Sequence, residues 1–411
     1  MMVHGSRFQL VRVLYQSVQS IMCAGRVISP RAGFATNPFI PTASATTDKP
    51  CLLSSALRSS SLLSPQLNGP TFPSSKFSSL KLCTVVAPRY SSRNSVRMSV
   101  DATESNAGKQ ALLLTDAAQL ISSVETFIFD CDGVIWNSGE LLEGVKETID
   151  MLRSLGKRLY FLTNNSTKSR RQYAERANKF GLGVRDDEIF SSGFAAALYL
   201  KTINFPANKK VYMISESGLS EELDQAGISY IGGPEDDDKK ADFTPGAYLH
   251  HDHDVGAVVV AFDRSVSYYK MQYAALCLRE NPGCLFIATN CDEVIIPTGV
   301  QGLPGEAAMV GAIKGTTKKQ PIVVGKPSTF MMDYLCERFN IKREQICMVG
   351  DNLETDILFG KNGGCKTLLV LTGVTDLKTL HSPENSIQPD YYTNQLSDLL
   401  VGSKLQTPTH Q

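Results

Sequence analysis

The sequence of 411 residues lacks several features that would assign it to a specialised class of protein. No run of 18 or more apolar residues is present, so we expect no transmembrane helix and no membrane partner. The ten cysteines include no CxxC pair and no spacing typical of zinc ligands, which argues against a structural zinc site and against a disulfide framework. A reducing, intracellular location fits this use of cysteine.

Acidic residues are almost absent from the first hundred positions. Residues 1–100 contain 11 Lys or Arg, 19 Ser and a single acid, Asp48. A basic, hydroxyl-rich and acid-poor leader is typical of an organelle transit peptide, and its length and serine density favour the chloroplast. We therefore predict that residues 1–98 are a disordered transit peptide, cleaved near Arg97-Met98-Ser99, which delivers the protein to the chloroplast stroma. The alternative is a disordered extension without a targeting role.

The remainder of the chain is acidic. Residues 101–411 hold 30 Lys or Arg and 40 Asp or Glu, a net charge of −10, although the whole chain has a net charge of zero. Such a body argues against binding to nucleic acid by general charge attraction, so we expect no nucleic-acid partner. With 42% hydrophobic and 20% charged residues, the chain can form an ordinary globular core.

From about residue 112 onwards, short apolar runs alternate with amphipathic helices. The runs predicted as strands of one sheet are residues 126–129, 158–162, 322–324, 346–349 and 367–371. Strand–helix alternation of this kind indicates a parallel sheet covered by helices on both faces. The runs that indicate a second, inserted α/β unit are residues 211–214, 257–262 and 284–288. The predicted fold class is therefore α/β, with a parallel-sheet core formed by residues 110–203 and 301–405 and an α/β insert at residues 204–300.

Polar signatures follow four of the predicted strands. They are Asp130-x-Asp132-Gly133, Thr163-Asn164-Asn165, Lys326 and Asp351. Because the carboxyl ends of parallel strands line one crevice, we expect these signatures to converge although more than 200 residues separate the first from the last. A single DxD motif is most often a solvated loop, but convergence from four strands is hard to obtain by chance.

Taken together, these signatures resemble a known family. FDCDGVIW, LTNNST, VGKPS and VGDNLETDI are similar to the four motifs of the haloacid dehalogenase superfamily, over about residues 120–400. The resemblance implies a Rossmann-like core and a C2-type cap formed by the insert. Stretches such as HDHDVGAVVV and ILFGKNGGCKTLLVL are similar to those of the plant phosphoglycolate phosphatases. That likeness implies a photorespiratory enzyme that converts 2-phosphoglycolate and water to glycolate and phosphate, and it allows a homodimer formed through the cap.

Hydrolysis of a phosphomonoester calls for a cation, because the two negative charges of the phosphate repel an anionic nucleophile. Mg²⁺ prefers oxygen ligands, and the carboxylates of Asp130 and Asp351 can supply them. The resemblance implies the backbone carbonyl of Asp132 as a third metal ligand. Asp356, five residues beyond Asp351, either orients Asp351 from outside the ligand set or binds the metal directly.

Two carboxylates are predicted to carry the covalent chemistry. Asp130 is the expected nucleophile, which would form an aspartyl-phosphate intermediate and divide hydrolysis into two steps. Asp132 is the expected general acid for the departing alkoxide and the general base for the water of the second step. The resembling dehalogenases and P-type ATPases lack an Asp at this second position, whereas the phosphatases keep it.

Four further residues are predicted to bind the substrate. Thr163 offers a hydroxyl and Asn164 a backbone N–H to phosphate oxygens. Lys326 places a positive charge beside the transferring phosphoryl group and beside Asp130. Asn165 either orients this loop or touches the substrate.

Two positions depart from the family pattern. Asn352 stands where Arg is expected in a GDRxxTDI pattern, and Cys291 stands where the plant enzymes have Arg. The alternatives are therefore a capped phosphatase for another small metabolite, such as a sugar phosphate, glycerol 3-phosphate or pyridoxal phosphate, and a weakly active paralogue that binds phospho-ligands. The absence of a histidine from Glu293–Ile296 argues against pyridoxal phosphate.

Three other features receive ordinary structural interpretations. Trp136, the only tryptophan, is predicted to be hydrophobic packing just beyond the catalytic loop. The acidic run Glu235–Asp238 is predicted to be a solvated loop. The run His250–Asp254 is predicted to be an exposed turn, because its spacing fits no known zinc framework.

Overall fold

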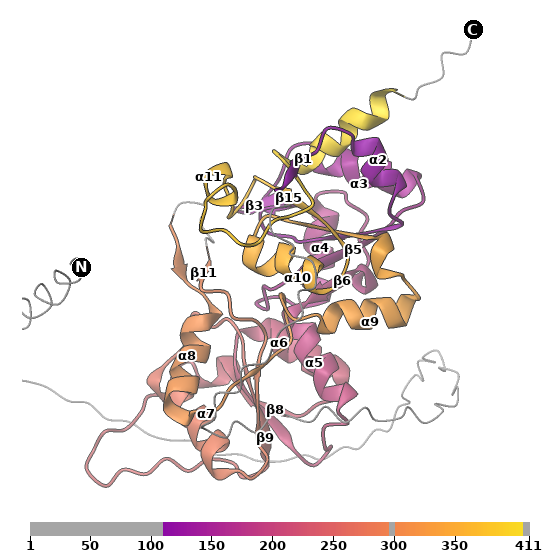
Figure 1. The fold of residues 1–411 in the computed structure, drawn as a ribbon. Helices are drawn as coiled ribbons and strands as arrows, with labels where there is room; N and C mark the ends of the chain where they lie inside the picture. Colours follow the sequence, from indigo (N-terminus) through magenta and orange to yellow (C-terminus); the bar gives the residue numbers. More distant parts are fainter. Residues whose placement is uncertain (1–109, 296–300, 406–411) are drawn as a thin grey trace, which may run out of the picture. The chain divides into compact units, whose positions relative to one another are not determined.

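The structure is a computed structural model, and it describes residues 110–295 and 301–405 (Figure 1). The predicted transit peptide at residues 1–98 lies outside the described residues. Two parallel sheets with covering helices make up most of the described chain. In this part of the protein, no helix is both long enough and apolar enough to span a membrane.

Seven strands of the described chain form the first sheet, and all neighbouring strands in it are parallel. In spatial order they are β1 (Leu112–Leu113), β16 (Tyr391–Thr393), β15 (Lys366–Val370), β14 (Ile346–Gly350), β2 (Thr126–Phe129), β5 (Arg158–Thr163) and β6 (Ile189–Ser191). The helices that belong with this sheet are α2 (Ala117–Ser122), α3 (Val145–Ser154), α4 (Arg170–Lys179), α9 (Phe330–Phe339), α10 (Leu358–Asn362) and α11 (Leu377–Leu380). Helix α5 (Ser192–Thr202) follows β6 and packs mainly against α6 (Ser217–Ala226). The predicted parallel α/β core is confirmed.

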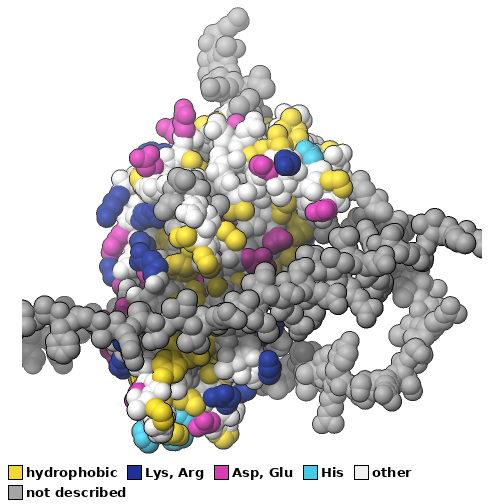
Figure 2. Space-filling view, turned by 90° about the vertical axis from the view of Figure 1, so that its left-hand side faces the viewer, with side chains coloured by type: hydrophobic (Ala, Val, Ile, Leu, Met, Phe, Trp, Pro, Cys, Tyr) yellow, Lys and Arg dark blue, Asp and Glu magenta, His cyan; other side chains and the backbone are white. Residues whose placement is uncertain are grey.

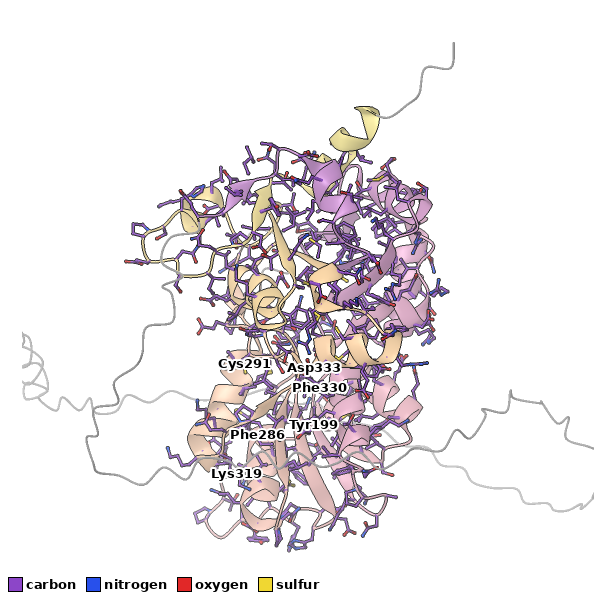
Figure 3. All side chains as sticks on the ribbon, turned by 45° about the vertical axis from the view of Figure 1, so that its right-hand side comes forward. Tyr199, Phe286, Cys291, Lys319, Phe330 and Asp333 are labelled. Carbon is purple, nitrogen blue, oxygen red and sulfur yellow. The ribbon has the colours of Figure 1, made fainter. Side chains whose placement is uncertain are left out.

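Strand β2 shows why a continuous apolar run marks a central parallel strand. Phe127 and Phe129 point into one hydrophobic cluster, together with side chains of α3 and α4, whereas Ile128 points into a second cluster on the other face. Both faces of the strand are buried, so no polar residue alternates with the apolar ones. The second cluster continues between α5 and α9, where the rings of Tyr199 and Phe330 meet edge to face at 5.7 Å (Figure 3).

A second sheet of five described strands is also entirely parallel. Its spatial order is β13 (Ile322–Val323), β10 (Leu285–Ala288), β9 (Val255–Val260), β7 (Lys210–Ile214) and β8 (Tyr230–Gly232). Helices α6 (Ser217–Ala226), α7 (Tyr268–Glu280) and α8 (Glu306–Thr317) belong to this part of the chain. A third hydrophobic cluster lies between the sheet and α7 and α8.

Short elements complete the described chain. Two hairpins pair β3 (Trp136–Asn137) with β4 (Glu140–Leu141) and β11 (Val294–Ile295) with β12 (Leu303–Pro304). The 3₁₀ segments are Asp186–Glu188, Gly233–Asp236, Arg343–Gln345 and Leu396–Leu405, and a π-helical turn spans Leu353–Ile357.

One predicted strand lies in the other sheet. Residues 322–324 were expected among the core strands, but Ile322 and Val323 pair with Ile287 and Ala288 at the edge of the second sheet. Helix α8 packs against α7 and delivers the chain to this edge. A three-residue apolar run indicates a strand but carries no information about its pairing partner. The second sheet therefore reaches Val323, while the domain limits at residues 203, 300 and 405 stay predictions.

The acidic run at Glu235–Asp238 is not simply a solvated loop. Asp236 is buried and accepts a hydrogen bond from the Tyr212 hydroxyl at 2.9 Å. Asp237 pairs with the buried ammonium of Lys270 at 2.6 Å, and Asp263 pairs with the same ammonium at 2.7 Å. Buried charges are tolerated in proteins when they are paired. Asp236 and Asp237 therefore attach this segment to Tyr212 and to Lys270.

The histidine run also differs from its prediction in one respect. His251 is buried rather than exposed, and its Nε2 lies 3.1 Å from Oδ1 of Asn281. Nδ1 of His253 lies 3.3 Å from the same oxygen. Figure 2 shows histidine side chains at the lower end of this face and a further one near its upper end. Asn281 thus contacts both rings, and the predicted exposed turn is wrong for His251.

Candidate active site

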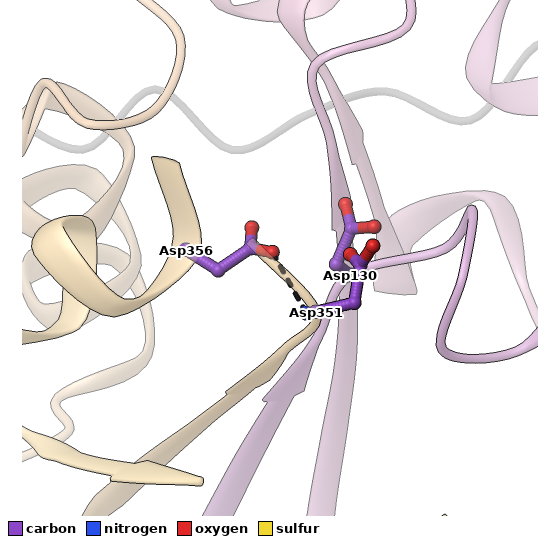
Figure 4. Close-up of side chains that lie close together, drawn as sticks. All are labelled: Asp130, Asp351 and Asp356. Atoms are coloured by element: carbon purple, nitrogen blue, oxygen red, sulfur yellow. Dashed lines mark hydrogen bonds between the residues drawn. The ribbon is translucent and has the colours of Figure 1, made fainter. Parts of the chain in front are cut away.

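Three of the predicted signatures meet at adjacent strand ends of the first sheet. Asp130 directly follows β2, Asp351 directly follows β14, and Thr163 is the last residue of β5. Strand β2 lies between the other two. One carboxylate oxygen from each of Asp130, Asp351 and Asp356 lies within 4.8 Å of the other two (Figure 4). The predicted convergence of these residues is therefore what the structure shows.

Lys326 reaches this cluster from the second sheet. It follows β13, and its ammonium lies 2.5 Å from Oδ1 of Asp130 and 2.6 Å from Oδ1 of Asp356. It also donates to the backbone oxygen of Leu162 at 3.1 Å. Burial lowers the pKa of Lys326, but the charges of Asp130 and Asp356 outweigh burial and raise that pKa above its ordinary value. Lys326 is therefore a fixed cation in the site.

The cluster holds more buried negative charge than Lys326 neutralises. Burial raises the pKa of Asp130 well above its ordinary value, and the charges of Asp356 and Asp351 raise it further against the opposing effect of Lys326. Burial and the charge of Asp356 raise the pKa of Asp351 to about 7. Neighbouring carboxylates repel one another when all are ionised, and a divalent cation between them would relieve that repulsion. The cluster is therefore suited to binding such a cation.

The hydrogen bonds show which oxygens remain for such a cation. Both oxygens of Asp356 are in use, because Oδ1 accepts from Lys326 and Oδ2 accepts from the backbone N–H groups of Asp351 and Asn352 at 3.1 Å (Figure 4). Oδ1 of Asp130 accepts from Lys326, and Oδ2 of Asp351 accepts from the N–H of Val374 at 2.7 Å. No hydrogen bond among the described residues uses Oδ2 of Asp130 or Oδ1 of Asp351, and these two oxygens fit a hard cation. This arrangement supports the orienting interpretation of Asp356.

Two glycines, Gly133 and Gly373, lie directly against the carboxylate of Asp351. A Cβ atom on Gly373 would lie 1.9 Å from Oδ2 of Asp351, and a Cβ on Gly133, which has a φ of +86°, would lie 2.6 Å from the same oxygen. Gly133 therefore has two reasons to be glycine, the positive φ and the close approach. Any side chain at either position would displace the carboxylate.

Because Asp351 is a predicted Mg²⁺ ligand, replacing Gly373 by Ala is expected to weaken the predicted Mg²⁺ activation by about 10–100-fold, the usual effect of disturbing a group that orients a metal ligand. The measurement is phosphatase activity against Mg²⁺ concentration. Gly311→Ala in helix α8 is the matched control, because a Cβ there meets nothing within 4 Å. An unchanged Mg²⁺ activation constant for Gly373→Ala would contradict the assignment of Asp351 as a metal ligand.

Asp132 is held differently from the buried carboxylates. Its side chain is exposed, and its Oδ1 accepts a hydrogen bond from the indole Nε1–H of Trp136 at 2.9 Å. Trp136 is buried, as expected of a packing residue, but the sequence interpretation missed its hydrogen bond. The two residues are only four apart in the sequence. That spacing would have predicted their hydrogen bond only if the turn at Gly133 had been known.

The loop after β5 is tied to both sheets through Asn164. The side-chain oxygen of Asn164 accepts from the backbone N–H of Lys326 at 2.9 Å, and its Nδ2 donates to the Lys326 carbonyl at 3.1 Å. The same Nδ2 donates to Oδ1 of Asp292 at 2.9 Å. The Thr163 hydroxyl oxygen accepts from the N–H of Asn165, whose own side chain binds Thr167. These contacts favour the loop-orienting interpretation of Asn165.

Three residues of the site were not predicted. Nδ2 of Asn290 donates at 2.8 Å both to the carbonyl of Asn164 and to Oε1 of Glu306. Burial raises the pKa of Glu306 to about 7, and burial also raises the pKa of the half-buried Asp292. A chain of polar contacts thus connects the loop after β5 with the first turn of α8. In the sequence, Asn290, Asp292 and Glu306 are isolated polar residues, and no local pattern predicted that they would join the site.

Replacing Glu306 by Gln is expected to stabilise the protein at pH 8 by about 2–3 kcal/mol and to change it little at pH 5. The pKa of Glu306 is raised from 4.5 to about 7, so the folded state holds this proton more tightly than the unfolded state. Stability from this group is therefore present below about pH 4.5 and is lost as pH rises to about 7. Gln keeps the oxygen that accepts from Asn290.

The measurement for this prediction is the urea midpoint of both proteins at pH 5 and pH 8. Glu143→Gln, at an exposed position, is the matched control and should shift neither midpoint. Equal effects of Glu306→Gln at the two pH values would show that Glu306 is ionised in the folded state throughout.

One pocket collects all eight predicted site residues. Its volume is about 500 Å³, and its lining includes Asp130, Asp132, Thr163, Asn164, Asn165, Lys326, Asp351 and Asp356. Asp292, Glu306 and the basic residues Lys168, Arg176 and Arg264 line it as well. Of the two departures from the family pattern, Asn352 lines the pocket and accepts from the N–H of Glu354, and Cys291 is exposed and labelled in Figure 3. The pocket can therefore hold a phosphate beside the carboxylates and a small organic group farther out.

Comparison with known proteins agrees with this geometry. Residues 127–229 match a family model described as haloacid dehalogenase-like hydrolase, and residues 323–399 match a second described as HAD-hydrolase-like. Phosphoglycolate phosphatase 1A, chloroplastic, of Arabidopsis thaliana is 61% identical over 301 residues, which cover 72% of this chain and 83% of the relative. The chain belongs to the haloacid dehalogenase superfamily of hydrolases.

More distant members of the superfamily cover the same part of the chain. Human glycerol-3-phosphate phosphatase is 37% identical over 301 residues, which cover 69% of this chain and 92% of that protein. The solved structure of p-nitrophenyl phosphatase from Archaeoglobus fulgidus matches with a TM-score of 0.59 and 32% identity, over 68% of this chain and 99% of the other. The resemblance to capped phosphatases of this superfamily is thereby confirmed.

Proposed function

We propose that this protein is a Mg²⁺-dependent phosphomonoester hydrolase that converts 2-phosphoglycolate and water to glycolate and phosphate in photorespiration. The observation that carries the proposal is the buried cluster of Asp130, Asp351, Asp356 and Lys326 at the end of a pocket that also contains Asp132. The identity of 61% to a phosphoglycolate phosphatase supports this choice of substrate.

The proposed reaction has two steps. In the first, a carboxylate oxygen of Asp130 attacks phosphorus, the bond from phosphorus to the alcohol oxygen breaks, and Asp132 gives its proton to that oxygen. In the second, Asp132 removes a proton from water, the water oxygen attacks phosphorus, and the bond to Asp130 breaks. Atoms and protons balance, because Asp130 ends as a carboxylate and Asp132 regains its proton.

Each remaining residue has a role that its contacts support. Asp130 and Asp351, with the backbone carbonyl of Asp132 that the resemblance implies, would hold Mg²⁺, which neutralises charge on the phosphate when bound. Lys326 holds Asp130 in place and faces the transferring phosphoryl group. Thr163 and Asn164 lie at the end of β5, where they can donate to phosphate oxygens.

The outer part of the pocket bears on the choice of substrate. Lys168 and Arg176 line the pocket and form no ion pair with any described residue, so either can meet the carboxylate of glycolate. Asp292 and Glu306 line the pocket too, and carboxylates of this kind suit a hydroxyl-bearing alcohol better. That observation and the human relative keep glycerol 3-phosphate as the second candidate.

The test is a substrate panel on metal-free protein to which Mg²⁺ is added back. We expect kcat/KM to be highest for 2-phosphoglycolate, lower for glycerol 3-phosphate, a sugar phosphate and pyridoxal phosphate, and zero for all of them in EDTA. A reversed order between the first two substrates would favour the second candidate. Failure to hydrolyse even p-nitrophenyl phosphate with Mg²⁺ would favour the weakly active paralogue.

We also propose that residues 1–98 deliver the protein to the chloroplast stroma. The composition of that segment and the word chloroplastic in the name of the Arabidopsis relative support this location. A fluorescent protein fused behind residues 1–98 should accumulate in chloroplasts of plant cells. A cytosolic signal would favour the extension without a targeting role. A homodimer stays a prediction that light scattering on the purified protein can test.

A further inference from the structure

We infer that Trp136 is a positioning residue for the general acid and base Asp132, which it holds through its indole N–H. The inference rests on the proposed function for the role of Asp132, but the contact itself stands apart from it. Nε1 of Trp136 lies 2.9 Å from Oδ1 of Asp132, within the range of a good hydrogen bond.

The indole ring is mounted rigidly. Trp136 is 1% exposed, and its ring stacks on Tyr173 with 6.3 Å between centroids and 7° between planes. The guanidinium of Arg176 lies 4.4 Å from the ring centroid, and Tyr173 and Arg176 are one turn apart on α4. Phe180 closes another side with its centroid at 6.4 Å. The contacts with Tyr173, Arg176 and Phe180 therefore restrict the orientation of the ring.

The backbone joins the two residues as well. The N–H of Gly133 donates to the carbonyl of Trp136 at 2.8 Å, and the N–H of Trp136 donates to the carbonyl of Cys131 at 3.2 Å. These bonds close a tight turn between the residue pair and fix the distance from the indole to Asp132. The position of Asp132 therefore depends on α4 through the ring of Trp136.

The hydrogen bond matters to both partners. Trp136 is the only described residue that donates to the carboxylate of Asp132, and that side chain is otherwise exposed. A buried indole N–H without an acceptor is unfavourable, so the bond is retained. With Oδ1 engaged by the indole, Oδ2 is the oxygen that we expect to transfer the proton. Another aromatic residue, such as Phe, could pack at this position, but it would not donate the hydrogen bond to Asp132.

Trp136→Phe separates positioning from packing, because Phe keeps an aromatic ring on Tyr173 and removes the N–H. We expect single-turnover release of glycolate from 2-phosphoglycolate to slow by about tenfold or more, a part of the 10²–10⁴-fold that a general acid supplies. Release of p-nitrophenolate, which leaves without a proton, should change less than threefold on the same grounds. Equal slowing for both substrates would overturn the positioning role and leave Trp136 a packing residue.

A second measurement tests the contact without any turnover. Trp136 is the only tryptophan of the chain, so the tryptophan emission of the full-length, metal-free protein reports this one indole. Asp132→Ala removes the acceptor and should shift the emission maximum or intensity, whereas Asp132→Asn keeps an oxygen and should stay close to wild type. Glu143→Ala, at an exposed position, is the control. Unchanged emission in Asp132→Ala would overturn the inference even in a fully active enzyme.

The two measurements also separate this inference from the proposed function. Absence of turnover by the wild-type protein on every phosphomonoester would refute the function, and the emission of Asp132→Ala would still decide the contact. If Trp136→Phe fails to fold, the same emission measurement decides the inference. An altered emission together with leaving-group-dependent slowing is the result that supports it.

Discussion

Replacing Asp130 by Asn is expected to lower turnover of every phosphomonoester by about 10⁴-fold or more, the scale on which loss of a catalytic nucleophile acts. An amide nitrogen and oxygen cannot attack phosphorus as a carboxylate does. Asn keeps an oxygen that can accept from Lys326, now 2.5 Å from Oδ1 of Asp130, so the loss should not come from unfolding. The loss should be as large for p-nitrophenyl phosphate as for 2-phosphoglycolate.

The measurements are steady-state turnover of both substrates and the urea midpoint of each protein. Asp186→Asn, an exposed residue of a 3₁₀ segment, controls for the loss of one carboxylate from the chain. Acid quench of the wild type should trap phosphate on the protein, and the Asp130→Asn protein should trap none. Activity within tenfold of wild type would show that another group attacks phosphorus.

The sequence was most informative about residues that directly follow buried strands. Asp130 and Asp351 each come after an apolar run whose two faces are covered, and such runs are recognisable because no polar residue interrupts them. Parallel neighbours bring the residues after them to one edge, so proximity followed from the pattern alone. The predicted runs 126–129, 158–162 and 346–349 agree with β2, β5 and β14 to within one residue.

Lys326 shows where that reasoning reaches its limit. Its convergence with Asp130 was predicted, but from a strand of the first sheet, and the structure brings it from β13 at the edge of the second. Local sequence indicates that a strand exists, whereas its partner depends on packing between distant helices such as α7 and α8. The correct residue was therefore reached by an argument that was right about the strand and wrong about the sheet.

Residues that act through side-chain networks were beyond local patterns altogether. Asn290 and Glu306 meet because the loop after β10 reaches the first turn of α8, and 16 residues separate them in the chain. A lone Asn in a loop and a Glu at a helix start are common without any function. The same holds for Trp136, whose buried ring was predicted while its hydrogen bond to Asp132 was not. Polar contacts of this kind depend on geometry that composition and periodicity do not record.

Replacing Asp132 by Asn is expected to slow the first step by about 10²–10⁴-fold with 2-phosphoglycolate and only mildly with p-nitrophenyl phosphate. Glycolate leaves as a strongly basic alkoxide that needs a proton, whereas p-nitrophenolate is stable without one at neutral pH. The structure is suited to this test, because Asp132 is exposed to the pocket and its amide counterpart keeps an oxygen for the Trp136 N–H. The geometry of the loop should therefore survive the change.

The measurement must isolate the first step, because Asp132 also serves as base for the water of the second. Single-turnover release of each alcohol does so, with Asp130→Asn as the inactive control. The phosphorylated enzyme should then accumulate in Asp132→Asn with p-nitrophenyl phosphate, since it forms readily and its hydrolysis lacks a base. Equal slowing of alcohol release for both substrates would mean that Asp132 holds the backbone turn or the cation site, and that the proton for glycolate comes from another donor in the pocket.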